Sequence, residues 1–228
     1  MKKIALVLFL LSGLSVFADD NVLIEEQSIQ SRINNCAMKI LNANKISKPV
    51  VFVYDDADKK TKLKLDTTLT KRQVVVYKYA YKHIEDENEL AAFLSRRISI
   101  ALRSFDGVFG GFLRSLQVSA APKKFEMVAD KRAVDFMVNA GYNPVALITY
   151  IQKTSPQRRF DAVSNHNLTS KRLATIYEYI YVKYPYYLKN NEYIKNENYQ
   201  NFLLTSQENR RLLQEKIMTG SGEKLKYE

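Results

Sequence analysis

The pattern of hydrophobic and polar positions predicts one helix and a small sheet in the first third of the chain. Between residues 28 and 42, apolar side chains recur at the spacing of one helix face, at Ile29, Ile33, Cys36, Ala37, Ile40 and Leu41. Three short runs rich in β-branched or alternating apolar residues follow, at residues 50–54, 62–69 and 73–77. The first is a continuous apolar run, typical of a buried strand, and the second alternates as a half-exposed strand does.

From residue 85 onward the pattern becomes helical. Acidic residues at 86–89 mark a helix start because the helix dipole favours negative charge there, and an apolar stripe continues to Leu102. Further helices are predicted at residues 125–140, 143–153, 169–183 and 208–218. We therefore expect an α+β fold, a small β-sheet with a mainly helical remainder, in one domain over residues 19–185. Residues 186–228 are a Lys-, Asn- and Tyr-rich C-terminal extension that we expect to be partly disordered.

The first eighteen residues have the organisation of a signal peptide. Lys2 and Lys3 give a positive start, residues 4–14 are almost wholly apolar, and small residues precede a cleavage site after Ala18. The apolar run is shorter than the roughly 20 residues that span a bilayer, which argues against the alternative of an uncleaved anchor. No later segment is apolar enough for a transmembrane helix. We expect an exported protein, located in the periplasm or outside the cell.

The composition is basic and contains a single cysteine. The 228 residues carry a formal net charge of +11, and removal of the signal peptide with its two lysines leaves 210 residues and +9. Such a chain is attracted to anionic envelope polymers, with nucleic acid the less favoured partner. AT-rich codons, which encode Lys, Asn, Tyr and Ile, explain the same bias without any partner. Cys36 lies on an apolar helix face, which is typical of a buried structural residue.

A direct search for catalytic motifs finds none. The two histidines, His83 and His166, have no second His or Cys at the spacing of metal ligands. The chain also lacks a Gly-rich phosphate loop after a strand and a G-x-S-x-G nucleophile turn. Motif by motif, the sequence indicates a mixed domain without a recognisable active site.

Three segments nevertheless occur in an order that is specific to one protein family. Residues 87–94 read ENELAAFL, residues 125–133 read FEMVADKRA and continue into FMVNAGYNP at 136–144, and residues 166–172 read HNLTSKR. This order resembles the HtpX-like zinc metallopeptidases, gluzincins that include the CAAX prenyl endopeptidases and many periplasmic proteases. In that family the segments are the run into the metal-binding helix, the second metal helix with its AGYDP turn, and the HPxxxxR segment. The resemblance covers about residues 29–184 and implies a zincin-like metallopeptidase fold.

The central zinc motif of that family is replaced in this chain. The family's HExxH helix binds zinc through two histidines, and its glutamate activates water. Arg96, Arg97 and Ile100 stand at those three positions. A guanidinium is always protonated and offers only donors, and isoleucine has no ligand atom, so none of the three can perform the chemistry. Glu126 is the only ligand-type residue retained, so the resemblance implies no catalytic residue, no bound metal and no cofactor, although the family uses zinc.

The surviving acids suggest a pseudo-site formed by Arg96, Glu126 and Asp130. Glu126 and Asp130 are four residues apart and share a helix face, which in the family points at the zinc-binding helix. We expect Arg96 to fill the vacant metal position and to pair with Glu126, because buried carboxylates need partners. In the alternative arrangement, Arg96 and Arg97 turn to solvent and the acids are exposed.

Two further residues lie in the segment that borders the substrate cleft of the family. His166 either marks a retained cleft wall or is a cap or surface residue, since nothing else titratable converges on it. Arg172 either reaches an acid across the cleft or lies on a solvated helix face. Both are therefore cleft candidates whose role the sequence leaves open.

Three functions are compatible with these features. The favoured one is an exported pseudo-metallopeptidase that binds envelope proteins or peptides, for example by strand addition, without zinc-dependent cleavage. The second is an active metalloendopeptidase with a non-standard site built from His83, His166 and carboxylates, which no ligand spacing supports. The third is a basic binder of anionic envelope polymers, for which strong salt dependence is expected.

Overall fold

The computed structural model describes residues 25–58, 73–104, 122–155, 169–223 and 225. The predicted signal peptide at 1–18, the strand predicted at 62–69 and His166 lie outside these residues. The first described helix spans residues 25–43 and includes the segment predicted at 28–42. No helix in the described ranges is long and apolar enough to cross a membrane.

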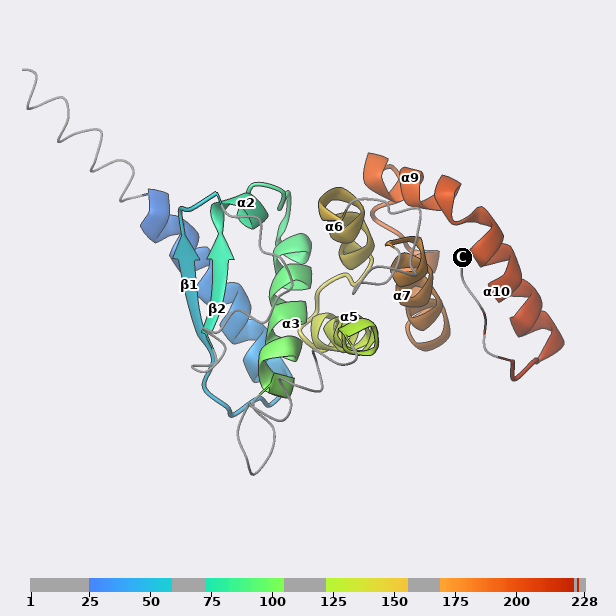
Figure 1. Ribbon diagram of the computed structural model, residues 1–228, viewed down its shortest axis with the longest axis horizontal. Coiled ribbons are helices and arrows are strands. Elements are labelled where there is room, and N and C mark those ends of the chain that lie inside the picture. The colour runs from blue at the N-terminus through green and yellow to red at the C-terminus, as the bar shows by residue number, and fades with distance from the viewer. Residues whose placement is uncertain (1–24, 59–72, 105–121, 156–168, 224, 226–228) are drawn as a thin grey trace, which may run out of the picture.

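The described sheet consists of two short parallel strands. β1 (Val51–Asp55) pairs with β2 (Gln73–Tyr77), and Phe52 lies opposite Val74. Both strands match the predicted runs to within one residue. Phe52, Val74 and Val76 are buried, whereas the residues between them are more exposed, so one face of the sheet packs on the core. In Figure 1 the helix of residues 25–43 lies behind the strands, and hydrogen bonds join it to β1.

Helices make up most of the remaining described chain. They are α2 (Lys78–Tyr81), α3 (Glu87–Ser104), α5 (Pro122–Asn139), α6 (Ala146–Thr154), α7 (Thr169–Lys183), α8 (Tyr186–Lys189), α9 (Glu197–Thr205) and α10 (Gln207–Thr219). The five helices predicted from residue 85 onward correspond to α3, α5, α6, α7 and α10 to within three residues at each end. The short helices α2, α8 and α9 are not predicted by the pattern. The α+β class, with a small sheet and a mainly helical remainder, is confirmed.

Local sequence signals define two of the helix ends. At the start of α3, the Asp86 carboxylate accepts a hydrogen bond from the Glu89 backbone N–H at 2.8 Å. The Glu89 carboxylate in turn accepts from the Glu85 N–H at 2.9 Å, which is a variant of the capping box. After α5, Gly141 adopts a left-handed φ of 73°, the conformation in which glycine commonly ends a helix.

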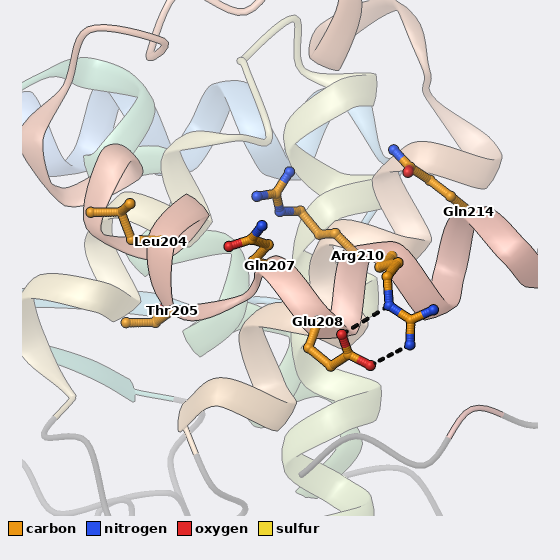
Figure 2. A pocket seen from close by; sticks show the side chains of 7 residues that line it. Leu204, Thr205, Gln207, Glu208, Arg210 and Gln214 are labelled. Atoms are coloured by element: carbon orange, nitrogen blue, oxygen red, sulfur yellow. Dashed lines mark hydrogen bonds and ion pairs between the residues drawn. The ribbon is translucent and has the colours of Figure 1, made fainter.

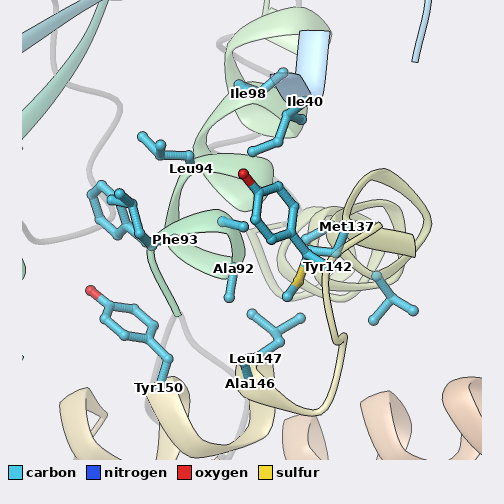
Figure 3. Packing of buried hydrophobic residues seen from close by; sticks show 14 of the residues in the cluster. Ile40, Ala92, Phe93, Leu94, Ile98, Met137, Tyr142, Ala146, Leu147 and Tyr150 are labelled. Atoms are coloured by element: carbon cyan, nitrogen blue, oxygen red, sulfur yellow. The ribbon is translucent and has the colours of Figure 1, made fainter. Parts of the chain in front are cut away.

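The hydrophobic core surrounds α3 and continues into the C-terminal helices. Leu90, Leu94 and Ile98 on α3 are fully buried. Figure 3 shows this helix between side chains of the first helix, of α5 and of α6. α9 packs against α6 and places the fully buried Phe202 in the same core, and α10 packs against α7. The core therefore extends past residue 185.

Cys36 is buried in this core, as predicted for a structural cysteine. Burial raises the pKa of its thiol to about 11, although a hydrogen bond with Tyr142 acts in the opposite direction. Because the thiolate is the reactive form, the folded protein holds this cysteine in its inert state at neutral pH.

We predict that Ellman's reagent modifies Cys36 very slowly in the folded protein. With a pKa of about 11, roughly one thiol in a thousand is ionised at pH 8, and the core also excludes the reagent. The thiol should react to completion, at one per chain, once the protein is unfolded in urea. Equal labelling rates in the folded and unfolded protein would show that Cys36 is accessible.

Candidate functional site

The candidate site lies where α3, α5 and α7 meet. α5 packs against both other helices, and Figure 1 shows it between them. α3 supplies Arg96, α5 supplies Glu126 and Asp130 from one face, and α7 supplies Arg172. These four residues are called the Arg–carboxylate cluster below.

Asp130 is the centre of this cluster. Its carboxylate accepts hydrogen bonds from Arg172 Nε at 2.8 Å and from Arg172 Nη2 at 2.9 Å, which is the bidentate arrangement of the strongest arginine–carboxylate pairs. Arg96 Nε donates to the same carboxylate at 2.7 Å. Glu126 contributes weaker ion pairs, since its Oε1 lies 3.6 Å from Arg96 Nη2 and 3.4 Å from Arg172 Nη1.

The four side chains are removed from water. Their exposed fractions are 2% for Asp130, 4% for Glu126, 6% for Arg172 and 12% for Arg96. Burial of single charges is costly, but two guanidinium groups and two carboxylates make a neutral set. Burial alone raises the pKa of Asp130, but the charges of Arg172 and Arg96 and their hydrogen bonds outweigh it and hold that pKa below its ordinary value. Asp130 is therefore ionised at neutral pH.

The expected contact between Arg96 and Glu126 is present, but it is not the main one. Arg96 makes its hydrogen bond to Asp130, and its buried Nη2 has no hydrogen-bond partner. Arg172 reaches the acids and does not lie on a solvated face, which decides between the two alternatives left by the sequence. The bidentate role of Arg172 is missed by sequence reasoning because its only signal was its place in the segment 166–172.

The other predicted positions lie elsewhere. The Arg97 guanidinium is 5.4 Å from the centre of the Phe93 ring, and the side chain is half-buried on α3. Ile100 is half-buried one turn further along the same helix. His83 follows α2, where its ring contacts Tyr79 edge-on at 5.1 Å. His166, as noted, is outside the described residues.

The residues of the cluster do not fit a zinc ion. Both carboxylates face guanidinium groups, which repel a cation and already engage the oxygens that would bind it. The described ranges contain no group of three or more His, Cys, Asp or Glu residues that could hold a metal ion. The arrangement can hold three helices together, but none of its groups is placed as a general base for water.

A second buried ion pair joins the start of α3 to α6. The Glu89 carboxylate, 1% exposed, accepts from Lys153 Nζ at 2.6 Å and from the Thr149 hydroxyl at 2.8 Å. Lys153 also pairs with Glu85 at 3.0 Å. Sequence reasoning placed Glu89 only as a helix-start acid, since its partners lie 60 or more residues away. This pair fixes the orientation of α3 independently of the cluster.

The outer surface at the corner of α9 and α10 contains a hollow of about 620 Å³, shown in Figure 2. Its lining is mostly polar and includes Arg211, whose Nε donates to Glu208 one turn earlier on α10 at 2.9 Å. None of its lining residues belongs to the cluster. It has no buried charge and no convergent polar group, so it is a surface feature and not a second candidate site.

Comparison with protein-family models, with curated proteins and with solved structures found no match for this chain.

We predict that Asp130→Asn lowers the free energy of unfolding by about 3–5 kcal/mol, because it leaves two buried guanidinium groups without their shared counter-charge. Urea denaturation at pH 7 measures the change. Glu208→Gln, which removes an exposed carboxylate paired with Arg211, is the matched control and should leave the midpoint unchanged. Equal effects of the two variants would mean that the cluster does not stabilise the fold.

The two arginines should differ in the same assay. Arg172→Ala is expected to destabilise the protein more than Arg96→Ala, since Arg172 makes two hydrogen bonds to Asp130 and Arg96 makes one. The reverse order would contradict the geometry described above.

We also predict a pH dependence that belongs to Asp130. Its pKa is lower in the folded state, so its contribution is complete above the unfolded value of about 3.9 and is lost as the pH falls through the folded value. The difference in unfolding free energy between wild type and Asp130→Asn should therefore be constant from about pH 5 to pH 7 and should shrink below about pH 4. A constant difference down to the lowest pH measured would assign the acid sensitivity to other groups.

Proposed function

We propose that this protein is a catalytically inactive relative of the HtpX-like zinc metallopeptidases, with a zincin-like fold, that binds envelope proteins or peptides without cleaving them. The observation that carries the proposal is the Arg–carboxylate cluster. It joins α3 and α5. By the sequence resemblance, these helices are the counterparts of the family's metal-binding pair, and Arg96 is aligned with the first ligand.

The chemistry of the cluster supports the loss of cleavage. Arg96 and Arg97 cannot accept a proton from water, and Ile100 has no ligand atom. The Asp130 carboxylate is held by three hydrogen bonds from guanidinium groups, so it is not free to act as a base. Glu126 faces the same two arginines.

The same cluster supports retention of a binding scaffold. In a metallopeptidase the ion joins the two helices, whereas here two guanidinium groups cross-link α3, α5 and α7 without it. A chain that has lost its catalytic residues can therefore keep the fold that binds a peptide. Peptide recognition on such a frame uses backbone hydrogen bonds to a strand edge, which requires no catalytic group. The predicted signal peptide assigns the targets to the periplasm or the exterior.

The test uses the full mature chain, residues 19–228. We expect no stoichiometric zinc by metal analysis, no cleavage of casein, and saturable binding of fluorescent, unfolded casein that EDTA does not change. Stoichiometric zinc with chelator-sensitive cleavage would replace the proposal by an active metalloendopeptidase. Binding that disappears with modest added salt would indicate a binder of anionic polymers.

A gain-of-metal variant tests the family assignment separately. The triple change Arg96→His, Arg97→Glu and Ile100→His restores HExxH opposite Glu126, so we expect it to bind one zinc ion per chain. Adding Glu126→Gln should weaken this binding, and the far-ultraviolet circular dichroism of both variants should match wild type. A folded triple variant that binds no zinc would contradict the zincin-like arrangement of these helices.

A further inference from the structure

The edge of β1 that faces away from β2 is occupied by a side chain of the first helix. The carboxamide of Gln30 donates from Nε2 to the Phe52 carbonyl at 3.1 Å, and its Oε1 accepts from the Tyr54 N–H at 2.7 Å. Gln30 lies on the helix of residues 25–43, 22 and 24 residues away from these partners.

This pair of bonds has the pattern of a neighbouring strand. Along a strand the backbone groups of successive residues point to opposite edges, so Phe52 and Tyr54 present theirs to one edge and Val53 presents its own to β2. In a parallel ladder one residue donates to the first of two such groups and accepts from the second. The Gln30 carboxamide, which is a primary amide, does both and so stands in for one residue of a parallel strand, opposite Val53.

The carboxamide is held in this position from its own helix. Gln30 Nε2 also donates to Asn34 Oδ1 at 2.9 Å, one helical turn further on. Both donor hydrogens and the acceptor of Gln30 are therefore engaged. Val51, which precedes Phe52 and points to the opposite face of the sheet, is 54% exposed.

We infer that the outer edge of β1 accepts an extended peptide running parallel to β1, and that Gln30 is an internal competitor that holds this edge closed. The inference rests on the proposed peptide-binding function and assigns it a place. The ligand is defined by its backbone, whose N–H and C=O would replace the carboxamide on Phe52 and Tyr54.

The test compares wild type with Gln30→Ala. The probe is a fluorescent, acetylated hexapeptide of alternating Thr and Val, which favours the extended form, and binding is followed by anisotropy. Removal of the competitor should tighten binding about tenfold, since two hydrogen bonds no longer have to be displaced. Gln27→Ala, an exposed glutamine one turn earlier on the same helix, is the matched control and should bind as wild type does. A peptide N-methylated at every residue should lose the gain, because neither of its edges can donate to Phe52.

Hydrogen exchange gives a second readout of the same edge. The Tyr54 amide should lose protection in Gln30→Ala and recover it when the peptide is added. Unchanged affinity together with an unprotected Tyr54 amide would overturn the inference. Self-association of Gln30→Ala that excludes the peptide would make a second copy of the chain the occupant and would overturn it as well.

These outcomes are separable from those of the proposed function. If wild type binds unfolded casein and Gln30→Ala gains nothing for the hexapeptide, the edge inference fails and the proposed function stands. If casein is not bound but the hexapeptide gain is seen, the edge inference stands and the proposed function fails.

Discussion

The helical part of this protein depends on the neutralisation of buried charge around Asp130. A carboxylate that is 2% exposed is stable only if positive groups with good geometry surround it, and Arg172 and Arg96 supply them from two other helices. The positions of α3, α5 and α7 relative to one another are therefore constrained by hydrogen-bond lengths as well as by packing. Hydrophobic contacts tolerate small shifts, whereas a bidentate arginine–carboxylate pair does not.

α3 is the element on which these constraints converge. Its first turn is joined to α6 through Glu89 and Lys153, and its third turn is joined to α5 through Arg96 and Asp130. Between them, Leu90 and Leu94 bury the apolar face of the helix in the core. The helix is thus fixed both along its length and about its axis, which is what a metal-binding helix also requires. The proposed change from zinc site to ion cluster keeps that requirement and discards the chemistry.

In the sheet, the polar groups that need partners belong to the backbone and not to charged side chains. A two-stranded sheet leaves backbone groups on its edges in the described part of the chain. Gln30 satisfies two of them with a side-chain amide. In the function that we propose, the Arg–carboxylate cluster replaces the means of cutting a peptide, and Gln30 controls where a peptide backbone is received.

Periodicity alone determined most of the secondary structure, because helices and strands at the core leave a regular apolar pattern within a few turns of chain. The strands β1 and β2, the long helices and the burial of Cys36 were predicted in this way, and the acidic residues at 86–89 indicated the start of α3. The type of residue at Arg96, Arg97 and Ile100 also sufficed to exclude the zinc motif. Only the tertiary structure decided that Asp130, and not Glu126, is the main partner of Arg96, that Arg172 completes the cluster, and that Gln30 closes β1. These contacts join residues 22 to 42 positions apart, so they depend on where whole elements pack and leave no local signal in the sequence.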